Sequence, residues 1–124
     1  MARLFKETEA RSMGLPGRKS LEIASGERGT QNVTLRLVEI PVARTGDKPR
    51  GQHRHEGFEE CIHVLSGEGL MIADSGQLPL KAGDTVVIPP GEMHVTRNTG
   101  KEPLKLLCFF PVGNVAARTR EPAA

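Results

Sequence analysis

The stretch HRHEGFEECIHVLSG, residues 53–67, decides how this chain folds. His53 and His55 are two residues apart, so on a β-strand both side chains point to the same face. Glu60 opens the next apolar run, where alternation puts Ile62 on the same side of the strand. If that side faces the core, the Glu60 carboxylate is buried, which is costly without a cation or hydrogen bonds. The stretch therefore predicts a buried carboxylate beside a pair of histidines in β structure.

A second stretch, GDTVVIPPGEMHVTRN at residues 83–98, adds a third histidine. Its two prolines end one strand and its Pro-Gly step lets the chain reverse, so His94 begins a strand that returns to the interior. A metal held by neutral imidazoles would compensate the buried carboxylate. His63 lies on the opposite side of its strand by parity and is not expected to bind. Glu59 competes with Glu60, but its parity and its spacing to the following glycine favour Glu60.

The composition indicates one small β domain. The chain has 124 residues, 37% of them hydrophobic, and its aromatic residues are four phenylalanines. Its 14 glycines and nine prolines favour short segments joined by turns over long helices. Short apolar runs rich in Val, Ile and Leu predict strands at 20–25, 33–40, 52–55, 60–65, 70–73, 85–88, 94–97 and 104–110. About eight closely spaced strands favour a sandwich or barrel.

Charge and cysteine content exclude several functional classes. Seventeen basic and 15 acidic residues leave a net charge of +2, too small to indicate a nucleic-acid or membrane partner. The chain shows no signal-peptide stretch and no apolar span long enough for a membrane helix. Two cysteines cannot form a multi-bridge framework, and they do not form a Cys-x-x-Cys motif. We therefore expect a cytoplasmic protein with reduced thiols.

Both stretches resemble the two motifs of the cupin superfamily. The first motif reads Gly, five residues, His-x-His, three or four residues, Glu, six residues, Gly, and residues 53–67 match all of it after the leading glycine. Asp47 occupies that leading position, with Gly46 beside it. The second motif reads Gly, five residues, Pro-x-Gly, two residues, His, three residues, Asn, and residues 83–98 match it throughout. The short segment between the motifs resembles that of small single-domain bacterial cupins of the cupin 2 type.

The resemblance implies an all-β fold, the cupin-type double-stranded β-helix or jelly-roll barrel. It also implies that one divalent transition metal is coordinated by His53, His55, Glu60 and His94, with one or two positions left to water or substrate. This ligand set suits Fe, Mn, Ni, Zn and Cu, so the metal stays open. Small cupins commonly pair, and the run at residues 106–110, apolar on both faces, is a candidate homodimer contact.

The resemblance divides the chain into three parts. We expect the cupin β-barrel at residues 20–112, an N-terminal arm at 1–19 and a C-terminal tail at 113–124. The two end segments mix small, polar and basic residues without periodicity, which is typical of surface arms. Residues 3–5 are a candidate edge strand, or a contact with a second subunit.

The resemblance leaves the reaction open, because a fold does not determine a function. A metal with open positions can act as a Lewis acid, lower the pKa of bound water, or bind O2 beside a substrate. The first hypothesis is a metal-dependent enzyme acting on a small polar, oxygen-bearing molecule, with dioxygenase chemistry ahead of isomerase or lyase chemistry on a sugar or sugar acid. The second is a non-catalytic module that binds such a small molecule. A site kept only for packing is disfavoured because all four ligands are present.

A general base would be needed in the enzymatic hypotheses. The chain has no Tyr and no Trp, which argues against lyases that rely on an active-site Tyr. The remaining candidates are Glu59, Glu92, Glu60 released from the metal, and a hydroxide on the metal. We name Glu60 and Glu92 as the catalytic candidates, the latter because it adjoins His94 at the mouth of the second motif.

Other chemically active side chains have a structural interpretation beside the functional one. Cys61 and Cys108 lie in apolar strands, which favours buried hydrophobes over reactive thiols. Arg36 and Arg97 are candidates to hold an anionic substrate, although parity favours the surface for the second. Phe58 is a candidate to cap the site or to plug the end of the barrel, and plugging is favoured.

Overall fold

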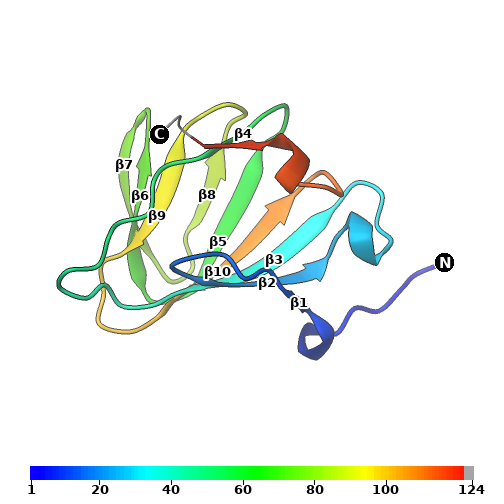
Figure 1. Ribbon diagram of the computed structural model, residues 1–124, viewed down its shortest axis with the longest axis horizontal. Coiled ribbons are helices and arrows are strands. Elements are labelled where there is room, and N and C mark those ends of the chain that lie inside the picture. Colours follow the sequence, from blue (N-terminus) through cyan, green and yellow to red (C-terminus); the bar gives the residue numbers. More distant parts are fainter. Residues whose placement is uncertain (122–124) are drawn as a thin grey trace.

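The computed structural model describes residues 1–121, and they form the predicted all-β fold (Figure 1). The strands are β1 Arg11–Ser12, β2 Lys19–Ala24, β3 Thr34–Ile40, β4 Arg54–His55, β5 Glu60–Ser66, β6 Glu68–Ala73, β7 Gly76–Lys81, β8 Thr85–Ile88, β9 His94–Asn98, β10 Leu104–Phe110 and β11 Thr119–Arg120. Three 3₁₀ helices, η1 Glu7–Glu9, η2 Gly26–Arg28 and η3 Ala116–Arg118, accompany them. In this part of the chain, no helix is long and apolar enough to cross a membrane.

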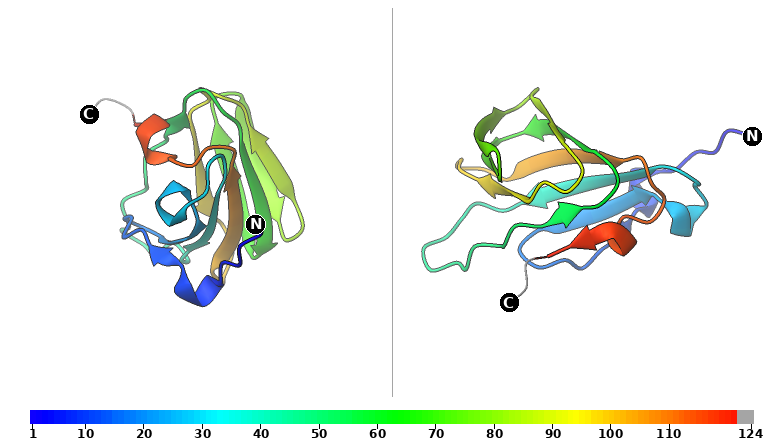
Figure 2. Two further views of the ribbon diagram at one scale, coloured as in Figure 1. Left: turned by 90° about the vertical axis from the view of Figure 1, so that its right-hand side faces the viewer. Right: turned by 90° about the horizontal axis from the view of Figure 1, so that it is seen from above.

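The strands form three antiparallel sheets that together make a barrel. The largest has the order β1-β2-β3-β10-β5-β8, the second the order β7-β6-β9, and the third pairs β11 with β4. Figures 1 and 2 show the β7-β6-β9 sheet at one end of the molecule and β1 and β2 at the other. Neighbours such as β3, β10 and β5 are far apart in sequence, as a jelly-roll topology requires.

The core lies between the sheets and follows the alternation of the strands. On β5, Ile62 and Val64 are buried, and the alternate residues of the strand are less buried. On β10, Leu106 pairs with Val64, and Cys108 pairs with Ile62, so the buried faces of the two strands coincide. A slip of one residue would expose this whole set, and burial therefore specifies the register. The same parity places Glu60 inside the barrel, as predicted.

Three strands, β1, β7 and β11, were absent from the sequence prediction, and one candidate edge strand is not formed. Residues 76–81 form β7, although Pro79 lies in the strand. β7 is an edge strand paired only with β6, so the missing N–H of proline costs no hydrogen bond inside a sheet. Residues 3–5 form no strand: Leu4 is exposed, and the Arg3 guanidinium donates to the carbonyl oxygen of Gly29.

Both end segments contribute strands to the sheets. β1 pairs with β2 at the edge of the large sheet. In the C-terminal segment, Thr119 pairs with His55 and Arg120 with Arg54, so this part of the predicted tail is tied to the barrel. The last three residues of that tail, 122–124, lie outside the described part of the chain. The division at residues 20 and 112 stays a prediction.

Candidate metal centre

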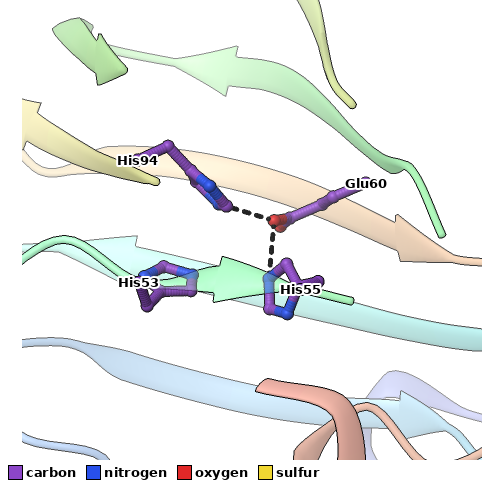
Figure 3. A group of neighbouring side chains, drawn as sticks. All are labelled: His53, His55, Glu60 and His94. Atoms are coloured by element: carbon purple, nitrogen blue, oxygen red, sulfur yellow. Dashed lines mark hydrogen bonds and ion pairs between the residues drawn. The ribbon is translucent and has the colours of Figure 1, made fainter. Parts of the chain in front are cut away.

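Residues from three sheets come together at one point inside the barrel (Figure 3). His55 lies in β4, Glu60 begins β5 and His94 begins β9. His53 precedes β4 and forms an isolated bridge with His94, in which each backbone N–H donates to the other carbonyl oxygen, at 2.9 and 2.8 Å. One ligand atom from each of the four side chains lies within 4.8 Å of the others. The four residues that the sequence singles out therefore form one group.

The turn of the second motif holds His94 in register with β4. The N–H of Gly91 donates to the carbonyl oxygen of His55 at 2.7 Å. Gly91 has a φ of 81°, a conformation that glycine adopts without steric cost. The Pro-Pro-Gly step thus lays the start of β9 across β4.

Outward hydrogen bonds determine which ring nitrogens face the group. Nδ1–H of His94 donates to the carbonyl oxygen of Glu92 at 2.9 Å. Nδ1–H of His55 donates to Thr119 Oγ1 at 3.0 Å, because that hydroxyl uses its own hydrogen on the carbonyl oxygen of Val115. A neutral imidazole has only one N–H, so both rings direct the Nε2 lone pair inward.

The inward atoms are all hydrogen-bond acceptors when the imidazoles are neutral. Nε2 of His55 and Nε2 of His94 lie 3.1 and 3.0 Å from the same oxygen, Oε1 of Glu60 (Figure 3). Two lone pairs and an anionic oxygen at this distance are compatible only when protons or a cation lie between them. Two donor atoms about 2.1 Å from one ion are about 3.0–3.4 Å apart when they are neighbours around it. The two contacts to Glu60 therefore fit a shared divalent metal in both donor chemistry and spacing.

The charge states of the group suit a cation. Burial alone would raise the pKa of Glu60, but hydrogen bonds with His55 and His94 outweigh it and lower the pKa to about 2. Burial, followed by the nearby His94, lowers the pKa of His53 to about 3, so this ring is neutral at neutral pH. Burial opposes protonation of His94, yet its bond with Glu60 leaves the pKa of that ring raised. An ionised carboxylate therefore lies beside imidazoles, and any proton on His94 would have to leave when a metal binds.

Three other side chains named in the sequence analysis lie outside the group. His63 is on the outer side of β5, where Nδ1 lies 2.8 Å from Thr85 Oγ1. Glu59 is exposed. The Glu92 carboxylate accepts hydrogen bonds from the backbone N–H and the hydroxyl of Ser75, and it does not line the cavity beside the histidines. The carbonyl oxygen of Glu92 orients His94, and a catalytic role for the Glu92 carboxylate stays a prediction.

The group opens into a cavity of about 70 Å³. Its apolar wall includes Ile62, Leu106 and Phe110. Cys108 also lines it and is buried, as the structural interpretation predicts, and burial raises the pKa of this thiol well above its usual range. Phe58 is buried and its ring stacks on that of His55, with the ring centroids 5.4 Å apart.

Sequence reasoning missed several residues around this site. Thr119 orients His55 from the C-terminal segment, and Arg18, Ser20 and Arg50 line the cavity. None of the four belongs to a motif of recognisable spacing. Arg36, a candidate anion binder from the sequence, does line the cavity, whereas Arg97 does not.

Comparisons with known proteins agree with this geometry. The Cupin domain family model matches residues 37–110, which include all four residues of the group. The Oxalate-binding protein of Thermotoga maritima is 40% identical over 60 residues, 48% of this chain and 50% of that protein. The chain spans about half the length of the curated relatives it matches.

Two solved structures show the same fold. An oxalate decarboxylase of Lactobacillus farciminis superposes with a TM-score of 0.76 at 21% identity, over 92% of this chain and 34% of that chain. The Streptomyces nucleoside dehydratase Pac13 superposes with a TM-score of 0.77 at 15% identity, over 98% of this chain and 92% of that chain. At these identities the likeness is one of fold.

Removing a central ligand should abolish metal retention. We expect His94→Ala to weaken binding of a divalent transition metal more than about 100-fold, because loss of an outer hydrogen-bond partner alone typically costs about 10–100-fold. Elemental analysis after dialysis measures the effect. His63→Ala is the matched control, and equal metal content in the two variants would contradict the prediction.

The hydroxyl of Thr119 should matter through His55 alone. We expect Thr119→Val to weaken metal binding about 10–100-fold, because the Nδ1–H of His55 loses the acceptor that fixes its tautomer. Thr119→Ser keeps the hydroxyl and should retain affinity near that of the unaltered chain. Titration with a competing chelator measures both, and identical affinities in the two variants would show that this bond does not orient the ring.

Proposed function

The chain belongs to the cupin family, and from this membership we propose that it is a metal-dependent enzyme acting on a small polar, oxygen-bearing molecule. The proposed ligands of one divalent transition metal, Fe, Mn, Ni, Zn or Cu, are His53, His55, Glu60 and His94. When bound, such an ion supplies a Lewis acid and, if it is redox-active, a centre for dioxygen chemistry. The observation that carries the proposal is the meeting of two inward lone pairs and one carboxylate oxygen at 3.0 and 3.1 Å.

The cavity favours dioxygenase-like oxidation over acid–base chemistry. Among the described residues that line it, Glu60 is the one carboxylate, and it is engaged by two histidines. Cys108, the one thiol there, has a raised pKa and is a poor base near neutral pH. An isomerase or lyase of a sugar or sugar acid would have to use Glu60 released from the metal, or a hydroxide on the metal, as its base. Oxidation at the metal places less demand on the side chains, with Glu60 as the candidate catalytic group.

The chain's own residues would prepare the site for such a reaction. Thr119 and the Glu92 carbonyl oxygen hold two imidazoles in the orientation that binds a metal. The apolar wall formed by Ile62, Leu106 and Phe110 limits the access of water to the reacting groups. Both devices act before substrate binds, so the protein is preorganised.

A non-catalytic binding module is the second candidate function. A relative of this chain is named Oxalate-binding protein, which describes capture and not turnover. The lack of an independent base among the described lining residues is equally consistent with simple binding. The cytoplasmic location, predicted from reduced thiols, stays a prediction; both cysteines are free in the structure.

We also propose that the protein forms a homodimer through the outer face of its large sheet. One row of side chains crosses four adjacent strands of this sheet, with each residue paired to the next: Leu35 on β3, Phe109 on β10, Cys61 on β5 and Val87 on β8. Phe109 is 40% exposed and Val87 is 53% exposed, so this apolar row reaches the surface. A second copy of the chain would cover it with a self-complementary patch.

Oxygen consumption separates the two candidate functions. We expect Fe(II)-loaded protein to consume oxygen with at least one member of a panel of catechols, diketones, thiols and sugar acids. His94→Ala should abolish the uptake, because the metal is lost, and His63→Ala should preserve it. Calorimetric binding of a panel member without turnover under any of the five metals would support the binding module instead.

A charge in the outer apolar row should dissociate the dimer. We expect Phe109→Asp to sediment as a monomer, because a carboxylate would be buried against an apolar face. Leu78→Asp is the control, since Leu78 is 53% exposed but lies on β7 in the other sheet. Analytical ultracentrifugation measures both, and a monomeric unaltered chain would refute the dimer.

A further inference from the structure

The cavity beside the candidate metal centre has a positively charged wall. Three arginines, Arg18, Arg36 and Arg50, line it. Arg18 lies in the loop between β1 and β2, and Arg50 lies in the long loop between β3 and β4, so two loops contribute to the same cavity. The Arg50 side chain donates to the carbonyl oxygen of Thr96 at 3.1 Å. Thr96 is two residues beyond His94 on β9, about 7 Å along a strand.

Two of these three arginines have no carboxylate partner within the described chain. Arg36 is paired with Glu22 at 3.2 Å. The structure gives Arg18 one hydrogen bond, to the carbonyl oxygen of Pro16 at 2.8 Å, and Arg50 the one to Thr96. A guanidinium has five N–H donors, so most donors of both groups are free for a ligand.

The two unpaired cations also repel each other. Burial lowers the pKa of Arg50 to about 10, and the nearby Arg18 lowers it further in the same direction. Burial lowers the pKa of Arg18, with Arg36 as the next cause. Without a ligand this wall therefore holds desolvated positive charge, which an anion would neutralise.

A buried hydroxyl adds a donor to the same wall. Ser20 on β2 lines the cavity and is 2% exposed. Its Oγ has no hydrogen-bond partner among residues 1–121. Buried hydroxyls normally find a partner, so this one indicates a ligand group that accepts a hydrogen bond.

We propose that the ligand of this cavity is a small carboxylic acid anion, one carboxylate of which is held by Arg18, Arg50 and the Ser20 hydroxyl. The proposal rests on the proposed function, since the other end of the molecule would meet the metal. Arginine forks match the planar carboxylate in a bidentate manner. At about 10–15 Å³ of such space for each water, a cavity of about 70 Å³ admits an acid of about two to four carbons.

The loop that contains Arg18 passes close to the Arg50 side chain at Gly17. A Cβ at position 17 would lie 2.9 Å from Cδ of Arg50, and Gly17 has a φ of 74°. Only glycine meets both conditions without displacing the arginine. The two loops therefore lie close together where Gly17 meets the Arg50 side chain, and both arginines line the same cavity.

Calorimetry of Mn(II)-loaded protein with malonate tests the proposal. We expect Arg18→Gln and Arg50→Gln each to weaken malonate binding about 10- to 100-fold, because each removes charge-assisted hydrogen bonds. Arg44→Gln, an exposed arginine in the same loop as Arg50, is the matched control and should bind as the unaltered chain does. Oxalate and succinate, titrated in parallel, measure the preferred length. Malonate affinity equal in the Arg18, Arg50 and Arg44 variants would overturn the proposal.

Ser20→Ala separates ligand binding from a structural role. Removing an unpartnered hydroxyl should leave the thermal midpoint of the ligand-free protein unchanged or raised, while malonate affinity falls. Unchanged affinity in this variant would remove Ser20 from the subsite. Metal content is measured in every sample. Protein that retains no metal but still binds malonate in an arginine-dependent manner would refute the proposed function and support the carboxylate subsite.

Discussion

Two imidazole lone pairs and one ionised carboxylate oxygen face one another inside a closed barrel. Hydrogen bonds on the outer side of the two rings hold them in this orientation. The Nδ1–H groups are committed to Thr119 and to the Glu92 carbonyl oxygen, so neither ring can turn its proton inward without losing a bond. The Glu60 carboxylate is buried and cannot turn to water. Burying such a charge without compensation costs several kcal/mol. A shared divalent ion removes the repulsion and the desolvation cost together.

This constraint also explains how the short strands are held. β4 has two residues, which is too short for an independently stable strand, yet β11 pairs with one side of it and His53 bridges to β9. Each of the three sheets contributes to the group: β4, β5 and β9 belong to different ones. An ion bound there would link all three sheets at one point. Binding of an ion there would therefore stabilise the barrel by mass action.

The sequence predicts the buried pattern well because alternation in a strand is a local property. The parity of β5 is enough to put Glu60 inside and His63 outside, and the spacing of the glycines and prolines indicates the turns. The other contributors come from contacts that only the folded chain creates. Thr119 reaches His55 across 64 residues, and Arg50 reaches Thr96 across 46 residues. β7 could not be predicted because it contains Pro79. Proline in a strand is tolerated only at a sheet edge, and whether a strand lies at an edge is decided by the whole sheet.

The charges of the candidate metal centre and of the arginine wall act on the same ligand. A divalent ion at the histidines carries more charge than Glu60 neutralises, and Arg18 and Arg50 add two cations without carboxylate partners in the described chain. A metal-loaded cavity therefore holds an excess of positive charge in a low dielectric, where a cationic molecule is repelled and a neutral one gains little. An anion that touches both the metal and the arginines lowers the electrostatic energy of each. By linkage the metal must then raise the affinity for the anion by the same factor as the anion raises the affinity for the metal. In the proposed site, binding of the metal by the histidines and Glu60 and binding of the acid by the arginines are therefore thermodynamically coupled.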